Sequence, residues 1–182
     1  MCGITGHYHF NKNQQISDSE IRLSLDQLKK RGPDNQTTFI APGIGLGHAR
    51  LKIIDMSSAA NQPMNDPTGR YTIVFNGEIF NYRQLRSELR LSDSITSDTE
   101  VLLHAYIRWQ HKCLDKLNGF FAFCIYDKET HSIFAARDRF GIKPFLYSME
   151  ESSFYFASEL KALAQYPIDN HLSNSAINNF FH

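Results

Sequence analysis

The chain has 182 residues, of which 42% are hydrophobic, and its 19 basic and 19 acidic side chains give a formal net charge of +0. This length fits one domain that can bury a sizeable core without disulfides or metals. The balanced charge gives no reason to expect nucleic acid or an anionic membrane as a partner, and no apolar run approaches the roughly 18 residues of a membrane helix. With no leader-like segment and three cysteines in neither a metal nor a disulfide pattern, we expect a reduced, cytoplasmic protein.

The first part of the chain predicts a strand, a helix and two further strands. Residues 2–10 are typical of a short strand with two glycines. A Ser-x-x-Glu capping box opens an expected helix at 17–30, which a Gly-Pro pair must end. Residues 36–41 and 44–54 indicate two strands joined through Pro-Gly. The polar, proline-containing stretch 55–70 indicates a loop.

The rest of the chain predicts helices followed by hairpins. Residues 71–76 form an apolar strand expected to end at Asn76-Gly77, with a helix from Glu78 to Leu89, and a second capping box at 97–100 opens another helix. The remaining expected elements are strands at 120–127, 132–138, 145–149 and 154–158 and helices at 158–166 and 173–182. This order, without regular βαβ alternation, favours an α+β fold with antiparallel sheets over a parallel doubly wound sheet. We expect a domain boundary near 168–172.

Cys2 is a candidate nucleophile because only Met1 precedes it. Removal of Met1 would give residue 2 both a thiol and a free α-amine, which is a nucleophile with its base on the same residue. An α-amine has a pKa of roughly 7.7–8.0, so at neutral pH a useful fraction could accept the thiol proton. The alternative is that Cys2 is a small buried packing residue.

Asn76 and Gly77 are candidate oxyanion donors. An Asn side-chain amide and a Gly backbone N–H at adjacent positions could converge on one oxygen. A plain Asn-Gly turn is the alternative. The predicted helix after Gly77 argues instead for a corner between a strand and a helix.

Three charged residues could bind a zwitterion. Arg50 lies at the edge of an apolar strand, where an inward-facing guanidinium could hold a carboxylate. Glu78 and Asp98 could hold an ammonium group. Each also has a structural interpretation: Arg50 as a solvent-facing or paired residue, and the two acids as residues favoured near a helix start by its dipole.

The other histidines and cysteines suggest no site. His7-x-His9 would share one face of a strand, but a third metal ligand is not evident. Cys113 and Cys124 lie in apolar surroundings and are expected to be packing residues.

An ordered set of motifs gives the chain a family resemblance. These are MCGITG (1–6), RGPDN (31–35), GHARLKIID (47–55), NQPM (61–64), FNGEIFNYRQL (75–85), SDTEVLLHAY (97–106), NGFFAFCIYD (118–127), RDRFGIKP (137–144) and FASELKAL (156–163). The chain resembles the glutaminase domain of glutamine-hydrolysing asparagine synthetases, which are class II glutamine amidotransferases. The chain departs from the usual family motifs at Lys30, where the family commonly has His, and at the Phe145-Leu146 pair. Neither departure falls on a proposed catalytic residue.

The resemblance implies a four-layer αββα sandwich of two antiparallel sheets, the N-terminal nucleophile hydrolase fold. It implies that Cys2 is the nucleophile and that Asn76 and Gly77 form the oxyanion hole. It also assigns substrate binding to Arg50 for the α-carboxylate, to Asp98 and Glu78 for the α-amine, and to a pocket lining. The residues expected in that lining are Leu51, Ile53 and Ile54.

The function expected from the resemblance is hydrolysis of L-glutamine to glutamate and ammonia, which a synthetase domain or subunit uses to make asparagine. Residues 1–168 would form the glutaminase domain, and 169–182 a linker and the first helix of a truncated synthetase domain. No cofactor is expected in this chain, and ATP and Mg²⁺ would belong to the synthetase half. A homodimer is a further expectation. The alternatives are a catalytically silent glutamine-binding or regulatory module, and a glutaminase subunit that serves amidation of another carboxylate.

Overall fold

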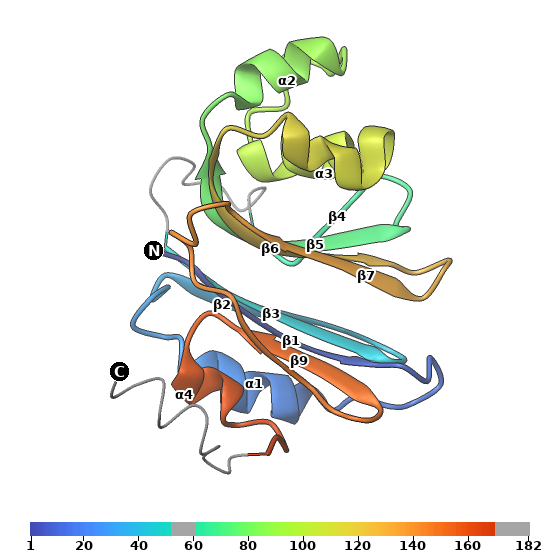
Figure 1. Cartoon of the computed structure of the whole chain (residues 1–182), viewed down its shortest axis with the longest axis vertical. Coiled ribbons are helices and arrows are strands. Elements are labelled where there is room, and N and C mark those ends of the chain that lie inside the picture. Colours follow the sequence, from blue (N-terminus) through green and yellow to red (C-terminus); the bar gives the residue numbers. More distant parts are fainter. Residues whose placement is uncertain (52–60, 170–182) are drawn as a thin grey trace, which may run out of the picture.

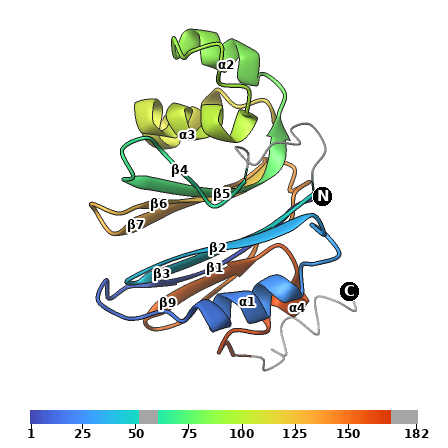
Figure 2. The same cartoon turned by 180° about the vertical axis from the view of Figure 1, so that it is seen from behind.

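Two antiparallel sheets lie face to face, with helices on their outer sides, in the computed structural model, which describes residues 1–51 and 61–169 (Figures 1 and 2). The five-stranded sheet has the order β2 (Asn35–Ala41), β3 (Ile44–Arg50), β1 (Gly3–His9), β9 (Ser153–Ala157) and β8 (Leu146–Met149). The four-stranded sheet has the order β4 (Met64–Asn65), β5 (Tyr71–Ile79), β6 (Gly119–Asp127) and β7 (Ser132–Arg137). The predicted α+β class and αββα layering are therefore confirmed.

The helices cover the two outer faces. α1 (Asp18–Asp26) and α4 (Leu160–Leu163) lie on the five-stranded sheet, whereas α2 (Tyr82–Glu88) and α3 (Asp98–Trp109) lie on the side of the four-stranded sheet (Figure 1). A 3₁₀ helix, η2 (Gln110–Asp115), continues from α3 and was not predicted. The described part of the chain contains no helix that is both long enough and apolar enough to cross a bilayer.

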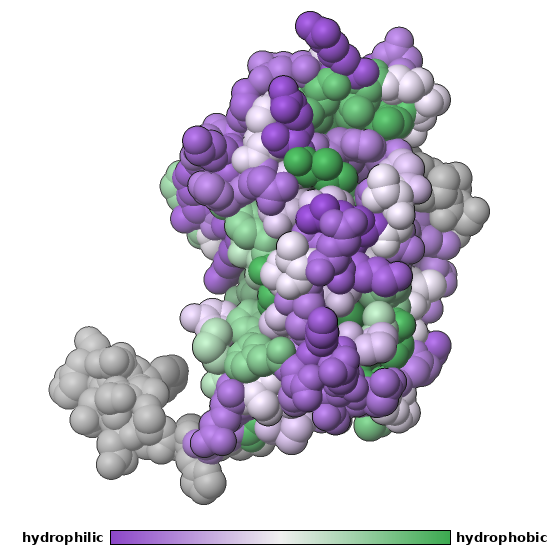
Figure 3. Space-filling model, turned by 90° about the vertical axis from the view of Figure 1, so that its right-hand side faces the viewer, coloured by the Kyte–Doolittle hydropathy of each residue, from purple (hydrophilic) through white to green (hydrophobic). Residues whose placement is uncertain are grey.

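Apolar side chains fill each of the three spaces between the layers. Ile4, Leu46 and Phe156 pack against Val74 between the sheets. Separate clusters lie under α1 and α4 and under α3. The outer surface seen in Figure 3 is mostly hydrophilic with smaller hydrophobic areas between. The different packing on the two faces of each sheet fixes strand register, because a slip of one residue would exchange the side chains that face the other sheet with those that face the helices.

The prediction that the strand at 71–76 ends at Asn76-Gly77 is wrong. β5 runs on to Ile79, because residues 76–79 continue the antiparallel ladder with β6, from Asn76 opposite Ala122 to Ile79 opposite Gly119. A Cβ atom on Gly77 would come within 2.3 Å of the Phe120 carbonyl oxygen, so glycine permits this close pairing. The helix expected from Glu78 begins only at Tyr82.

Other element predictions need smaller corrections. Both capping boxes mark a helix start, but the Ser17 side chain accepts from Ser19 N and Ser97 makes no cap hydrogen bond through its side chain. β4 lies in the stretch expected to be a loop, and α4 covers only part of the helix expected at 158–166. The helix expected at 173–182 lies outside the described residues.

Candidate active site

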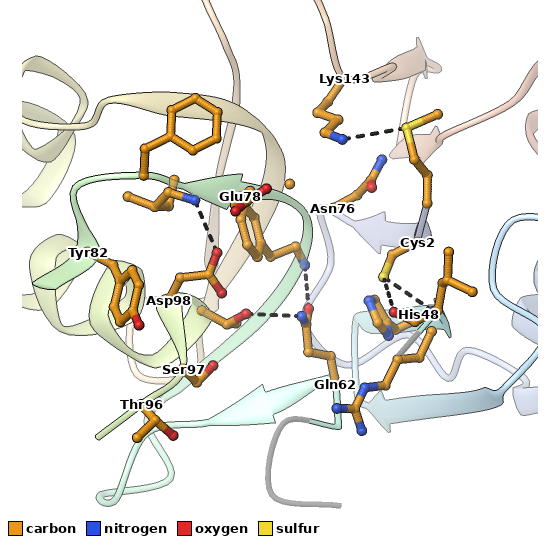
Figure 4. Close-up of a pocket in the computed structure, with 18 residues that line it drawn as sticks. Cys2, His48, Gln62, Asn76, Glu78, Tyr82, Thr96, Ser97, Asp98 and Lys143 are labelled. Carbon is orange, nitrogen blue, oxygen red and sulfur yellow. Dashed lines mark hydrogen bonds between the residues drawn. The ribbon is translucent and has the colours of Figure 1, made fainter. Parts of the chain in front are cut away.

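A cavity of about 220 Å³ opens at the end of the sandwich where β1 begins and β3 ends, between the two sheets and the start of α3 (Figure 4). The structure brings seven of the predicted site residues to its walls. These are Cys2, Arg50, Leu51, Asn76, Gly77, Glu78 and Asp98. The other two, Ile53 and Ile54, lie outside the described residues.

Cys2 is held by the backbone of the strand beside it. The Leu51 N–H donates to the Cys2 Sγ at 3.4 Å, and the Leu51 carbonyl oxygen lies 3.8 Å from the same sulfur. Arg31 Nε donates to the Cys2 carbonyl at 2.9 Å, and the same guanidinium pairs with Glu159 at 3.2 Å. These contacts, together with the pairing of β1 to β3 and β9, fix the thiol at the cavity wall.

Asn76 places an unpartnered donor beside the thiol. Its side chain is 1% exposed, and its amide nitrogen Nδ2 has no hydrogen-bond partner among the described residues. In Figure 4 this amide lies on the same side of the cavity as Cys2 and Lys143. Buried polar groups in proteins are nearly always hydrogen-bonded, so a free donor aimed into a cavity indicates a place for a ligand acceptor.

Arg50 brings a positive charge to the cavity. It is the last residue of β3, and its side chain is 5% exposed, on the face of the strand that packs against the other sheet. Its Nη1 donates to Asn61 Oδ1 at 2.6 Å. This hydrogen bond with a neutral amide orients the guanidinium.

Asp98 and Glu78 supply negative charge on the wall across from Cys2 (Figure 4). Asp98 Oδ2 accepts from Ile79 N at 3.1 Å. Burial raises the pKa of Asp98, the nearby charge of Glu78 raises it further, and hydrogen bonds from the backbone of Ile79 and Thr99 oppose the rise. A cation bound between the two carboxylates would favour their charged forms.

Sequence reasoning did not single out two buried residues of this cavity, His48 and Gln62. Burial lowers the pKa of His48 to about 4. The positive charge of Arg50 also lowers this pKa, whereas the backbone of Phe75 raises it. The His48 ring is therefore neutral at pH 7. Gln62 bridges β5 and α3. The NQPM motif contains Gln62, but only the three-dimensional contacts reveal its partners.

The remaining candidates behave as packing or structural groups. Cys113 and Cys124 are buried in apolar clusters, and burial raises the pKa of both thiols, that of Cys113 to about 11. His7 bonds to Glu20 at 2.7 Å and to Ser153 at 3.0 Å. Across residues 1–51 and 61–169, no group of three or more His, Cys, Asp or Glu side chains is placed to hold a metal ion.

Two solved structures share this fold. One is the Bacillus subtilis glutamine phosphoribosylpyrophosphate (PRPP) amidotransferase complexed with ADP and GMP, with a TM-score of 0.72 and 22% identity, covering 90% of this chain and 43% of that one. A structure described as the allosteric regulatory enzyme of purine biosynthesis gives a TM-score of 0.71, with 21% identity and the same coverage. The two sheets and their outer helices therefore define an N-terminal nucleophile hydrolase fold.

Sequence comparison then gives the family. The family model described as a glutamine amidotransferase domain matches residues 1–182, and the chain belongs to this family. Asparagine synthetase 3 (glutamine-hydrolyzing) of Bacillus subtilis is 45% identical over 172 residues, which cover 92% of this chain and 28% of that protein. A putative asparagine synthetase 2 (glutamine-hydrolyzing) of Methanocaldococcus jannaschii is 40% identical over 181 residues, 90% of this chain and 35% of that protein. The chain thus spans about a third of the length of these relatives.

Proposed function

We propose that this chain hydrolyses the side-chain amide of L-glutamine to glutamate and ammonia through a thioester on Cys2. The observation that carries the proposal is the buried Asn76 amide nitrogen, which faces the Cys2 side of the cavity and has no hydrogen-bond partner in the described part of the chain. A preorganised donor of this kind stabilises the negative oxygen that forms when a nucleophile attacks an acyl carbon.

Acylation begins when the α-amine of Cys2, free after removal of Met1, accepts the thiol proton. The thiolate forms a bond to the amide carbon of glutamine, and the resulting oxyanion accepts hydrogen bonds from Asn76 Nδ2 and the Gly77 N–H. The carbon–nitrogen bond then breaks. The α-ammonium returns its proton to the leaving nitrogen, which departs as ammonia.

Deacylation uses the same groups in reverse. The α-amine removes a proton from water, the hydroxide attacks the thioester carbon, and the sulfur leaves with its electron pair to be protonated again as the Cys2 thiol. His48 is a poor alternative base, because burial holds its pKa near 4, well below neutral pH.

The charges of the cavity match an amino acid. Arg50 would bind the α-carboxylate, and Asp98 with Glu78 would bind the α-ammonium on the opposite wall. Leu51 would line the space between, together with Ile53 and Ile54. A ligand held at both charged groups has its side-chain amide directed toward the thiol, which lowers the entropic cost of the reaction.

The ammonia would serve an asparagine-forming synthetase domain or subunit, which would hold ATP and Mg²⁺. The matched region makes up 28% and 35% of the two relatives named as glutamine-hydrolyzing asparagine synthetases. A surface suited to a partner lies beside the cavity residue Lys143, where Phe140 is 88% exposed and Ile142 is 48% exposed. The Asp138 carboxylate fixes this turn by accepting from the backbone N–H groups of Phe140, Ile142 and Lys143. Exposed apolar side chains on a rigid turn are typical of interaction sites.

The test is glutamate release from L-glutamine by protein whose loss of Met1 has been verified by intact mass. Cys2→Ala should abolish hydrolysis while the protein stays folded and still binds glutamine by calorimetry. Cys113→Ala, which removes a thiol buried in the core, is the matched control and should keep the wild-type rate. Glutamate release by Cys2→Ala at the wild-type rate would exclude the proposal.

A further inference from the structure

Gln62 lies two residues before the start of β4, beside the edge of β5. In the antiparallel pairing, Met64 lies opposite Ile73, so two more residues would place Gln62 opposite Phe75. There the Gln62 side chain takes the place of a strand backbone, and its Oε1 accepts from Phe75 N at 2.6 Å. The bond holds β5 at the residue immediately before Asn76.

The same side chain reaches the start of α3. Gln62 Nε2 donates to Thr99 Oγ1 at 3.2 Å, and Figure 4 shows Gln62 between β5 and α3 with a hydrogen bond to each. Gln62 is 6% exposed and Thr99 5%, so the contact is shielded from water. Thr99 directly follows Asp98, and the bond therefore fixes the first turn of α3 against β5.

Asn61 contacts Arg50, the positively charged residue of the cavity. Its Oδ1 accepts from Arg50 Nη1 at 2.6 Å, while the Gln62 backbone carbonyl accepts from Thr37 Oγ1 of β2. Two consecutive residues thus contact both sheets and α3. Asn61 contacts Arg50. Gln62 contacts Phe75 and Thr99, which are the sequence neighbours of Asn76 and Asp98.

We propose that Asn61 and Gln62 are positioning residues that fix the distance between Arg50 and Asp98 and so select a ligand with both an α-carboxylate and an α-ammonium. This inference rests on the proposed glutaminase function. Neither residue needs to touch a reacting atom. Gln62 acts through two backbone segments, and Asn61 acts through the guanidinium that it orients.

Substitution of Thr99 allows the two side-chain hydrogen bonds of Gln62 to be tested separately. Thr99→Val removes the hydroxyl that receives the Gln62 amide and loosens the Asp98 side alone, so KM for L-glutamine should rise about tenfold with kcat nearly unchanged. Thr99→Ser keeps the hydroxyl and should restore the wild-type KM. Gln62→Leu also frees the strand before Asn76, so kcat should fall as well, with a loss of roughly a hundredfold in kcat/KM.

Gln36→Leu is the matched control. Gln36 also donates one side-chain hydrogen bond, to the Leu25 carbonyl at 3.1 Å, but it does so on the α1 side of the sheet, away from the cavity. The control should leave KM and kcat at wild-type values even if it lowers Tm. Folded Thr99→Val and Gln62→Leu proteins with wild-type KM would overturn the inference without affecting the proposed function.

Amide hydrogen exchange tests the same inference without activity. Gln62→Leu should speed exchange at residues 75–79 and 97–100, and Gln36→Leu should not. If wild-type protein without Met1 released no glutamate, the proposed function would fail, whereas exchange would still test the positioning contacts. Equal exchange in wild type and Gln62→Leu would refute them.

Discussion

Replacement of Asn76 by alanine should separate catalysis from stability. The Asn76 amide nitrogen is buried and has no hydrogen-bond partner among the described residues, so Asn76→Ala removes a donor without breaking a hydrogen bond to any of them. A buried donor left unsatisfied costs about 1–3 kcal/mol. Removing it offsets the packing lost with the side chain, and the free energy of unfolding should stay within about 1 kcal/mol of wild type.

The effect of the same change on the reaction should be large. Loss of one oxyanion donor lowers kcat by about 10²–10³, equivalent to roughly 2.7–4 kcal/mol of transition-state stabilisation. KM should change little, because the donor is used mainly after the thiolate attacks. The assays are glutamate release at saturating L-glutamine and denaturant unfolding of the same preparations.

Asn81 provides the reciprocal control. Its Nδ2 donates to the Lys116 carbonyl at 2.9 Å, and its Oδ1 accepts from Asn118 N at 3.0 Å. Asn81→Ala should therefore lower the free energy of unfolding by about 1–2 kcal/mol and leave kcat unchanged. The reasoning would be refuted if Asn76→Ala kept the wild-type kcat, or if it destabilised the fold more than Asn81→Ala did.

Two further predictions concern Arg50 and His48. Arg50→Ala should raise KM for L-glutamine about 10- to 150-fold, because a charged hydrogen-bond partner contributes about 1.5–3 kcal/mol, and an unchanged KM would rule out carboxylate binding at this residue. His48 has a pKa of about 4 in the folded protein against an ordinary value of 6.5, so the unfolded chain binds the proton more readily. The free energy of unfolding should therefore fall by about 3 kcal/mol as pH drops from above 6.5 to 4. His48→Gln should lack this pH-dependent loss in unfolding measurements across the same range. Equal slopes of unfolding free energy against pH for the two proteins would contradict the prediction.

The sequence predicts most elements because their patterns are local. The expected strands and helices follow apolar runs and turn residues, and the four layers follow from the family resemblance. The error at Asn76-Gly77 shows where local rules fail. Asn-Gly normally indicates a turn, but the ladder of β5 with β6 carries the strand through both residues to Ile79.

The sequence indicates some residues of the candidate site and misses others. Cys2 directly precedes β1, and Arg50, Asn76 and Asp98 lie on β3, β5 and α3. No spacing along the chain places them in one cavity, so their chemistry suggests their roles and the motif resemblance assigns them to a single site. Gln62 escaped prediction because its role depends on a hydrogen bond to β5 and on a helix start 37 positions away in sequence.

The most direct test of the account is the intact mass of protein lacking Met1, quenched in acid during turnover of L-glutamine. Wild-type protein should show a species heavier by one glutamyl group, located on Cys2, that is absent from Cys2→Ala and disappears as glutamate is released. Hydrolysis without that adduct in wild type, or an adduct on Cys113 or Cys124 in its place, would contradict the claim that Cys2 is the nucleophile.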